Sequence, residues 1–384
     1  MKIITRALSR AGYLLSREAG YYRARPANLV LFLTYRCTSR CAACSMWKRQ
    51  INDQELSLEE WQGFIDSLPF KIRNIEMFGG DALLRKETLI PLIRYCRKRG
   101  IPEIDLVTNA SLLDENTARE LIKAGITTVT VSMDGIGKTH ERIRGVPESF
   151  EKVIHGIEYL LRHRNYRQNP LIVANCTVSK LNAGGISEIA DYADALGVDI
   201  TAFEYVGEFP QETLARSEIN GISPTPYYVA QNDSLLLNLS EALGIKKSIT
   251  EIKKHFKDSR MKLFTRNIDI LKPEDMINGT FPFKRCYVCR YYITVDPYGN
   301  ILPCLFYHNY HLGNIRKEKF GPLWKNEKHR AFMKHAGKTE MCKHCILAVE
   351  RNASLGQALG KSLPAIRDER NNKRYYKEHS YERD

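Results

Sequence analysis

Residues 29–44 read Leu-Val-Leu-Phe-Leu-Thr-Tyr-Arg-Cys-Thr-Ser-Arg-Cys-Ala-Ala-Cys, an apolar run followed by three closely spaced cysteines. The run is typical of a buried strand, and Cys37, Cys41 and Cys44 follow it as C-x3-C-x2-C. Thiolates this close together suit a soft metal centre, and cysteine is the usual ligand of iron–sulfur clusters. A cluster of four irons needs four ligands, so this motif would leave one iron open to bind a reacting group.

From residue 29 to about residue 206, strand patterns alternate with helical patterns over short connections. The strand patterns cover residues 29–35, 74–78, 103–107, 127–132, 171–178 and 198–205. The helical patterns cover about 57–68, 86–99, 114–124, 149–164 and 185–196. Six strands in this alternation predict an α/β fold with a parallel layer or a partial barrel. In such folds the chemistry lies at the C-terminal ends of the strands, which is where the three cysteines stand.

Polar or glycine-rich segments stand at the ends of the later strands. They are Gly79-Gly80-Asp81, Thr108-Asn109, Ser132 with Asp134, and Asn175 with Thr177. Together with the three-cysteine motif, these segments resemble the radical S-adenosylmethionine (SAM) enzymes over residues 29–206. The resemblance implies a partial (β/α)6 barrel in which Cys37, Cys41 and Cys44 hold a SAM-binding 4Fe–4S cluster. It also implies that the strand-end residues contact SAM, with Arg144 and Arg142 as candidates for the SAM carboxylate.

The resemblance also implies a reaction. In this family SAM binds the open iron, an electron from the reduced cluster breaks the sulfonium bond, and the resulting 5′-deoxyadenosyl radical abstracts a hydrogen atom from the substrate. The cofactor supplies this chemistry, while the protein orients the substrate and excludes side reactions. Because the cluster must be reduced in each cycle, we expect an external one-electron donor of the flavodoxin or ferredoxin type.

Two positions depart from the pattern of the family. Asp81-Ala82 replaces the usual Glu-Pro, so a side-chain contact there would be shorter by one methylene. Ala43 replaces the aromatic residue that many members carry before the third cysteine, and Trp47 is a candidate substitute. Two purely structural interpretations also stay open. Ser132 and Asp134 could form and cap a polar turn, and Arg144 could form surface salt bridges.

A second group of cysteines lies near the C-terminus. Two strand patterns, 291–296 and 301–306, flank the turn Pro297-Tyr298-Gly299-Asn300 and predict a β-hairpin. The spacing Cys289-x9-Gly299-x4-Cys304, followed by Cys342-x2-Cys345, resembles the Twitch or shortened SPASM extension of the radical SAM superfamily. The resemblance implies one auxiliary 4Fe–4S cluster. Five thiols compete for its four irons, with Cys286 the least certain ligand, and a three-ligand cluster or a zinc site stays open.

The remaining segments complete the predicted domain organisation. Residues 1–28 form an amphipathic N-terminal helix, 29–206 the partial barrel, 207–285 a bridging region with helical patterns at 234–243 and 249–256, 286–365 the auxiliary-cluster domain and 366–384 a charged tail. The basic face of the first helix allows two interpretations. The helix packs on the body of the protein or a partner, or it makes peripheral contact with an anionic membrane.

Composition limits the class of protein. A hydrophobic content of 43% and a charged content of 27% are ordinary for a globular chain. The sequence contains no run of 18 uncharged apolar residues, so it predicts no membrane-spanning helix. Eight of the ten cysteines fall into clusters, which is typical of metal binding in a reducing cytoplasm. Cys96 and Cys176 stand alone and are expected in the core. The net charge of +14 could attract nucleic acid, but no RNA-binding module is visible.

These observations predict a radical SAM oxidoreductase or maturase. An auxiliary cluster is useful when a substrate radical must lose an electron, and we expect oxidation or cross-linking of a peptide or protein. The alternative within the class is a dehydrogenase or epimerase of a small molecule, sugar or lipid intermediate. The alternative of another class is a non-catalytic iron–sulfur or zinc protein that binds a partner.

Overall fold

The computed structural model describes residues 26–164, 169–230, 233–282, 286 and 288–347, which fall within one compact unit. The predictions for the N-terminal helix and its membrane contact, and for the charged C-terminal tail, concern segments outside these residues. Among the described residues, no helix has the length and apolar character that crossing a membrane requires.

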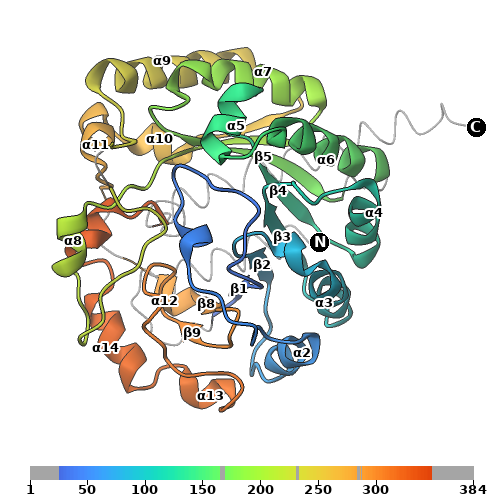
Figure 1. The fold of residues 1–384 in the computed structure, drawn as a ribbon, viewed down its shortest axis with the longest axis vertical. Helices are drawn as coiled ribbons and strands as arrows, with labels where there is room; N and C mark the ends of the chain where they lie inside the picture. The colour runs from blue at the N-terminus through green and yellow to red at the C-terminus, as the bar shows by residue number, and fades with distance from the viewer. Residues whose placement is uncertain (1–25, 165–168, 231–232, 283–285, 287, 348–384) are drawn as a thin grey trace, which may run out of the picture. The chain divides into compact units, whose positions relative to one another are not determined.

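A single mixed sheet organises the described chain (Figure 1). Its strands are β1 (Asn28–Phe32), β2 (Asn74–Phe78), β3 (Glu103–Thr108), β4 (Thr128–Ser132), β5 (Leu171–Val178), β6 (Ile200–Tyr205), β7 (Lys262–Phe264), β8 (Tyr292–Val295) and β9 (Ile301–Leu302). Their spatial order is β7-β6-β5-β4-β3-β2-β1-β8-β9, and every neighbouring pair is parallel except β8 with β9. The α/β partial barrel with a C-terminal hairpin is therefore confirmed.

Helices connect the parallel strands, as right-handed crossover units require. The α-helices of this part are α2 (Leu58–Asp66), α3 (Lys86–Lys98), α4 (Glu115–Ala124), α5 (Lys138–Arg144), α6 (Ser149–His163) and α7 (Ile186–Leu196). Short 3₁₀ helices add η1 (Met46–Lys48), η2 (Ala82–Arg85) and η3 (Ala183–Gly185). A capping box of Ser57 and Glu60 starts α2. Gly125 and Gly197 end α4 and α7 in the left-handed conformation that glycine adopts freely.

The bridging region is more regular than its sequence suggests. The two expected helices are one, α9 (Leu239–His255), which starts at a capping box on Asn238 and runs through Gly244. The prediction of a break was wrong because a single glycine costs a helix only about 1 kcal/mol. The region also contributes α8 (Gln211–Ala215), α10 (Arg266–Ile270), α11 (Pro273–Asn278) and the edge strand β7. Packing of α9 on α7 and α11 buries its apolar stripe.

The C-terminal part extends the same sheet. Strand β8 pairs in parallel with β1, and the short strand β9 turns back on β8. Around this hairpin lie α12 (Val288–Tyr291), α13 (Phe320–Leu323), α14 (Glu327–His335) and the 3₁₀ helix η4 (Glu340–His344). Because β8 runs parallel to β1, the residues after β8 and the residues after β1 emerge at the same edge of the sheet.

Candidate metal and SAM site

The loop that carries the first three cysteines is fastened to the C-terminal end of α5. The backbone N–H groups of Arg40 and Ala42 donate to the carbonyl oxygens of Arg144 and Ile143, each over 2.9 Å. Gly145 follows with a φ of +66°, and a Cβ there would lie 2.7 Å from the Arg40 carbonyl oxygen. Only glycine permits this approach. The sequence did not predict helix α5, and therefore did not predict this half of the support for the cysteine loop.

The glycines after β2 provide the other half. The N–H groups of Gly80 and Asp81 donate to the carbonyl oxygens of Thr34 and Arg36 over 2.9 and 2.8 Å. A Cβ on Gly79 would lie 2.3 Å from the Thr34 oxygen, and a Cβ on Gly80 would lie 2.0 Å from the Arg36 oxygen. These glycines therefore let the turn after β2 pack backbone to backbone against the segment that leads into Cys37.

Each of the three sulfur atoms receives a hydrogen-bond donor. The backbone N–H of Ser39 reaches Cys37 Sγ over 3.4 Å, and that of Met46 reaches Cys44 Sγ over 3.4 Å. Arg144 Nη1 lies 3.5 Å from Cys41 Sγ. Burial raises the pKa of Cys37 and raises that of Cys44 to about 11, so these thiols do not ionise unaided. A bound metal would deprotonate them, and the donors would then stabilise the thiolates.

Arg144 and Asp134 form a buried ion pair beside the cysteine loop. Arg144 Nη2 lies 2.6 Å from Asp134 Oδ2, and the side chains are 14% and 4% exposed. Asp134 Oδ1 also accepts the N–H of Thr177 on β5 over 2.8 Å. The structure thus places Arg144 between a carboxylate and Cys41, whereas Arg142 donates to the carbonyl oxygen of Leu181 over 3.3 Å and is exposed. The surface salt bridge considered for Arg144 is absent, because its partner is buried.

Asp81 presents an incompletely bonded carboxylate at the end of β2. Its Oδ1 accepts from Thr108 Oγ1 over 3.0 Å and from the N–H of Leu83 over 3.3 Å. Its Oδ2 is buried and has no hydrogen-bond partner among the described residues. Burial raises the pKa of Asp81 to about 6. A buried acceptor without a donor is costly, so a cationic group placed beside it would bind favourably.

Three other predicted residues occupy two different settings. Asn109 is committed to the cysteine loop, because its Nδ2 donates to Thr38 Oγ1 and Ser39 Oγ over 2.9 Å each. Ser132 and Asn175 are partners in the register of β4 and β5, and both lie on the half-buried face of the sheet. They therefore stand side by side, where a ligand at the strand ends could reach both.

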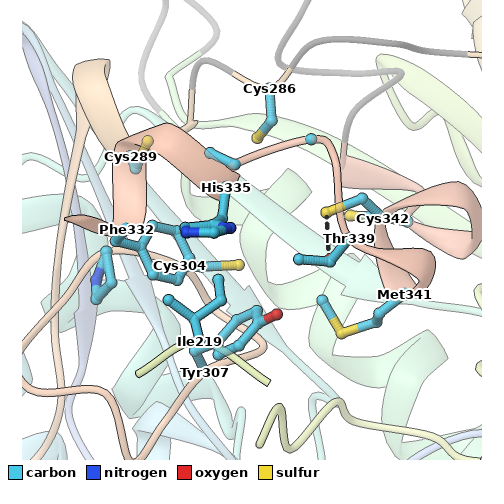
Figure 2. A pocket seen from close by; sticks show the side chains of 14 residues that line it. Ile219, Cys286, Cys289, Cys304, Tyr307, Phe332, His335, Thr339, Met341 and Cys342 are labelled. Atoms are coloured by element: carbon cyan, nitrogen blue, oxygen red, sulfur yellow. Dashed lines mark hydrogen bonds between the residues drawn. The ribbon is translucent and has the colours of Figure 1, made fainter. Parts of the chain in front are cut away.

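The five C-terminal cysteines line a single cavity (Figure 2). Cys286 and Cys289 come from the chain around α12, Cys304 follows β9, and Cys342 and Cys345 lie at η4. Figure 2 shows the sulfur atoms of Cys286, Cys304 and Cys342 turned toward the same central space. Burial raises the pKa of both Cys289 and Cys304. The cavity fits one soft metal centre bound by thiolates.

Neighbouring groups hold these cysteines in place. His329 Nε2 lies 2.6 Å from the carbonyl oxygen of Cys289, and burial lowers the His329 pKa to about 4, which keeps the ring neutral. The N–H of Phe306 lies 3.5 Å from Cys304 Sγ, and Thr339 Oγ1 lies 3.1 Å from Cys342 Sγ. In the described part of the chain, no three His, Cys, Asp or Glu side chains are already set around a metal position. The inference that both groups of cysteines bind a metal centre therefore rests on their sets of thiol ligands and on the hydrogen bonds to the sulfur atoms.

One segment of the bridging region connects the two cysteine centres. The N–H of Ser45, next to Cys44, donates to the carbonyl oxygen of Tyr227. The Tyr227 ring packs edge to face on Phe306, with 5.1 Å between centroids, and Phe306 donates to Cys304. The sequence does not indicate this connection, because aromatic residues in an irregular segment carry no periodic signal.

Comparisons with known proteins agree with this geometry. Residues 31–179 match the model of the radical SAM superfamily, and residues 286–346 match the SPASM model, an iron–sulfur cluster-binding domain. The AdoMet-dependent heme synthase of Methanosarcina barkeri is 28% identical over 78% of this chain and 82% of the relative. GTP 3′,8-cyclase 2 of Pseudomonas aeruginosa is 31% identical over 49% of this chain and 57% of the relative.

Solved structures share the fold. Native anSMEcpe with bound AdoMet has a TM-score of 0.62 at 18% identity, over 90% of this chain and 100% of that one. SuiB of Streptococcus suis bound to S-adenosylmethionine has a TM-score of 0.59 at 15% identity, over 84% of this chain and 72% of that one. The chain belongs to the radical SAM superfamily and carries a C-terminal SPASM iron–sulfur domain. Its cofactors are SAM with a 4Fe–4S cluster, and an auxiliary iron–sulfur cluster.

Proposed function

We propose that this radical SAM enzyme oxidises or cross-links its substrate: a hydrogen atom is abstracted from the substrate, and the auxiliary cluster would accept one electron from the substrate radical as the substrate loses a proton. The observation that carries the proposal is the pair of cysteine centres in one compact unit, joined through Ser45, Tyr227 and Phe306. When bound, the SAM-ligated cluster supplies the radical.

We assign the residues of the first site as follows. Cys37, Cys41 and Cys44 bind the cluster, and Arg144, held by Asp134, donates to the Cys41 thiolate. The free Oδ2 of Asp81 would accept a hydrogen bond from an N–H of the SAM amino group. Further polar contacts to SAM come from Ser132 and Asn175. Asn109, Thr108 and the two glycines act indirectly, because their polar groups already hold the cysteine loop or Asp81.

For the second site we propose four cysteine ligands among five candidates. Cys286 joins Cys304 and Cys342 in that set, because all three sulfur atoms face the central space of Figure 2. The fourth ligand is Cys289 or Cys345, both of which line the same cavity. With four thiolates the cluster is closed and transfers electrons. We propose that the boundaries at residues 206/207 and 285/286 separate regions of different function. They do not separate independently folded domains, because β7 and β8 belong to the same sheet.

A peptide or protein is our first candidate for the substrate. Two structures that share this fold are recorded with bound peptides, anSMEcpe with the Cp18Cys peptide and SuiB with its precursor peptide SuiA. A small molecule is the second candidate, favoured by the heme synthase and GTP cyclase relatives. An external flavodoxin- or ferredoxin-type protein would reduce the first cluster, and the charge of +14 suits such an acidic donor. We place the reaction in the cytoplasm, because the cysteines require a reducing compartment.

The test is reductive cleavage of SAM. Protein reconstituted with iron and sulfide and reduced with dithionite should convert SAM to 5′-deoxyadenosine. An extract of cells that express the chain should increase this yield. Loss of the increase after protease treatment of the extract would identify a peptide or protein, and its persistence would identify a small molecule. Binding of SAM without any cleavage would contradict the proposed reaction and favour a non-catalytic iron–sulfur protein.

A further inference from the structure

A second cleft, of about 610 Å³, lies beside the first cysteine loop. Its walls come from the loop after Cys44, the segment 225–226, the turn after β8 and the loop that follows Cys304. Tyr35 and Ser45, which flank the three cysteines in the sequence, both line it. The cleft therefore opens at the sheet edge where β1 and β8 end, next to the proposed radical site. Its volume is in the range of pockets that hold small ligands.

Two cations, Arg49 and Lys48, line this cleft. Arg49 Nη2 donates to the carbonyl oxygen of Thr225 over 2.9 Å, and the guanidinium lies 5.3 Å from the centre of the Tyr35 ring. Lys48 Nζ lies 5.0 Å from the centre of the Trp47 ring. Within the described part of the chain, neither side chain forms an ion pair with a carboxylate. Arg49 is thus held in position while most of its five N–H donors stay available.

His308 adds an unused polar atom to the same wall. Its side chain is 4% exposed, and its Nδ1 lies 3.0 Å from the Tyr35 hydroxyl. Its Nε2 has no hydrogen-bond partner among the described residues. Burial holds the pKa of His308 well below its usual value, so the ring is neutral. When the Tyr35 hydroxyl donates to Nδ1, the ring proton is on Nε2, which is then a donor.

The carboxylate in the cleft wall is already occupied. Asp296 is buried, and its two oxygens accept from the N–H of Tyr298, the N–H of Asn300 and Asn300 Nδ2, over 2.8 to 2.9 Å. It serves the turn after β8 and offers little to a ligand. Arg49, Lys48 and His308 thus offer two cations and a neutral donor to the cleft, a combination that binds anions.

We propose that this cleft binds a carboxylate or phosphate group of the substrate, with Arg49 and Lys48 as its main contacts and His308 as a further donor. The inference deepens the proposed function and rests on it, since the cleft is lined both by residues that flank the first cysteine loop and by residues of the loop after Cys304. An anionic group anchored there would fix the substrate and leave its uncharged part free to reach the strand ends. Carboxylate and phosphate share this chemistry, and the experiment distinguishes them.

The test is anion binding to the reconstituted protein, measured by calorimetry with citrate and with pyrophosphate at constant ionic strength. We expect one of them to bind, and Arg49→Gln and Lys48→Gln each to weaken it about tenfold, as loss of a hydrogen bond to a charged group does. Lys262→Gln is the matched control, because Lys262 is exposed on β7 and does not line the cleft. It should leave the affinity unchanged.

His308 is tested by a pair of variants. His308→Phe and Tyr35→Phe both remove the hydrogen bond between the two side chains, but only His308→Phe removes Nε2. We expect weaker anion binding in His308→Phe than in Tyr35→Phe. Equal affinities in the two variants would remove His308 from the site.

The outcomes separate this inference from the proposed function. If neither anion binds the wild type, or if Lys262→Gln weakens binding as much as Arg49→Gln, the anion site is wrong even when SAM is cleaved. If the anion binds as expected but SAM is not cleaved, the proposed reaction is wrong and the site stands. Preference for citrate identifies a carboxylate substrate, and preference for pyrophosphate identifies a phosphate ester.

Discussion

The two cysteine centres are built in opposite ways. The first draws its three thiols from one short loop, Cys37 to Cys44, and the fold holds that loop from both sides by backbone hydrogen bonds. The second draws five thiols from three segments up to 59 residues apart in the chain, 286 to 345, and encloses them in a cavity. A centre on one loop leaves an open side for a ligand. A centre assembled from distant segments is enclosed and ties those segments together.

This difference determines how much each metal centre contributes to folding stability. A metal that joins distant segments contributes its binding free energy to folding. The first loop needs no such help, because α5 and the turn after β2 already position it. Loss of the second cluster should therefore loosen the C-terminal part, whereas loss of the first should remove activity with less effect on stability.

The largest effects are expected when one cysteine of each centre is replaced in separate variants. Cys41→Ala should abolish formation of 5′-deoxyadenosine and lower the iron content from about eight to about four per chain, because each 4Fe–4S cluster holds four irons. Cys304→Ser should cause the same loss of iron, lower the melting temperature and keep SAM cleavage without substrate. Iron analysis, chromatography of the nucleoside product and thermal melting measure the three effects. SAM cleavage by Cys41→Ala would disprove the assignment of the first centre.

The next test breaks the ion pair beside the first centre. Asp134→Ala leaves Arg144 buried without its carboxylate and should destabilise the protein by about 3–5 kcal/mol. Asp199→Ala is the matched control, because Asp199 forms a comparable buried pair with Arg164 at 2.8 Å, with side chains 11% and 12% exposed. Both variants should lose stability in denaturant titrations. Only Asp134→Ala should also lose cluster from the first site, and equal loss in both would show that Asp134 has a general structural role.

The sequence predicted the sheet well, because each of the first six strands carries strong apolar runs between helix signals. It also predicted which cysteines cluster. It did not predict β7, whose three residues have no visible period, or α5, which starts at Lys138 after the N-cap residue Gly137 and has no side-chain cap. The pairing of β8 with β1 joins segments more than 260 residues apart, and no local pattern encodes such a contact. Sequence also pointed to Gly79, Gly80 and Asn109 as SAM contacts; in the structure these residues fasten the cysteine loop, and their contact with SAM stays a prediction.

A smaller effect is expected from Gly80→Ala. Its new Cβ would lie 2.0 Å from the Arg36 carbonyl oxygen, so the turn after β2 must move away from the cysteine loop. We expect a destabilisation of about 1–3 kcal/mol, the usual cost of overpacking, together with weaker binding of the first cluster. Gly184→Ala is the control, since no atom lies within 4 Å of its added Cβ. Full cluster content in Gly80→Ala would show that this contact does not position the loop.

The smallest effect concerns the pH dependence of SAM binding. The pKa of Asp81 is about 6, above its usual range, so the folded protein favours the neutral carboxyl group. The stability from that neutral form is complete below about pH 4 and is lost as the pH rises through about 6. An N–H of the SAM amino group beside Oδ2 reverses the preference, because it donates a stronger hydrogen bond to the ionised carboxylate than to the neutral carboxyl group. SAM affinity should therefore fall as the pH is lowered through 6, by up to about tenfold per unit.

Asp81→Asn separates the effect of the Asp81 charge on stability from its effect on SAM binding. At pH 8 it removes the cost of a buried charge, so the SAM-free protein should melt at a higher temperature than the wild type. It also removes the charged acceptor for the SAM amino group, so SAM should bind more weakly and with no pH dependence between 5.5 and 7.5. Calorimetry of SAM binding across this range and thermal melting at pH 8 provide both measurements. If the wild-type affinity for SAM does not change with pH, SAM does not contact Asp81. The ligand contact that distinguishes the open first centre from the closed second centre must then come from another residue.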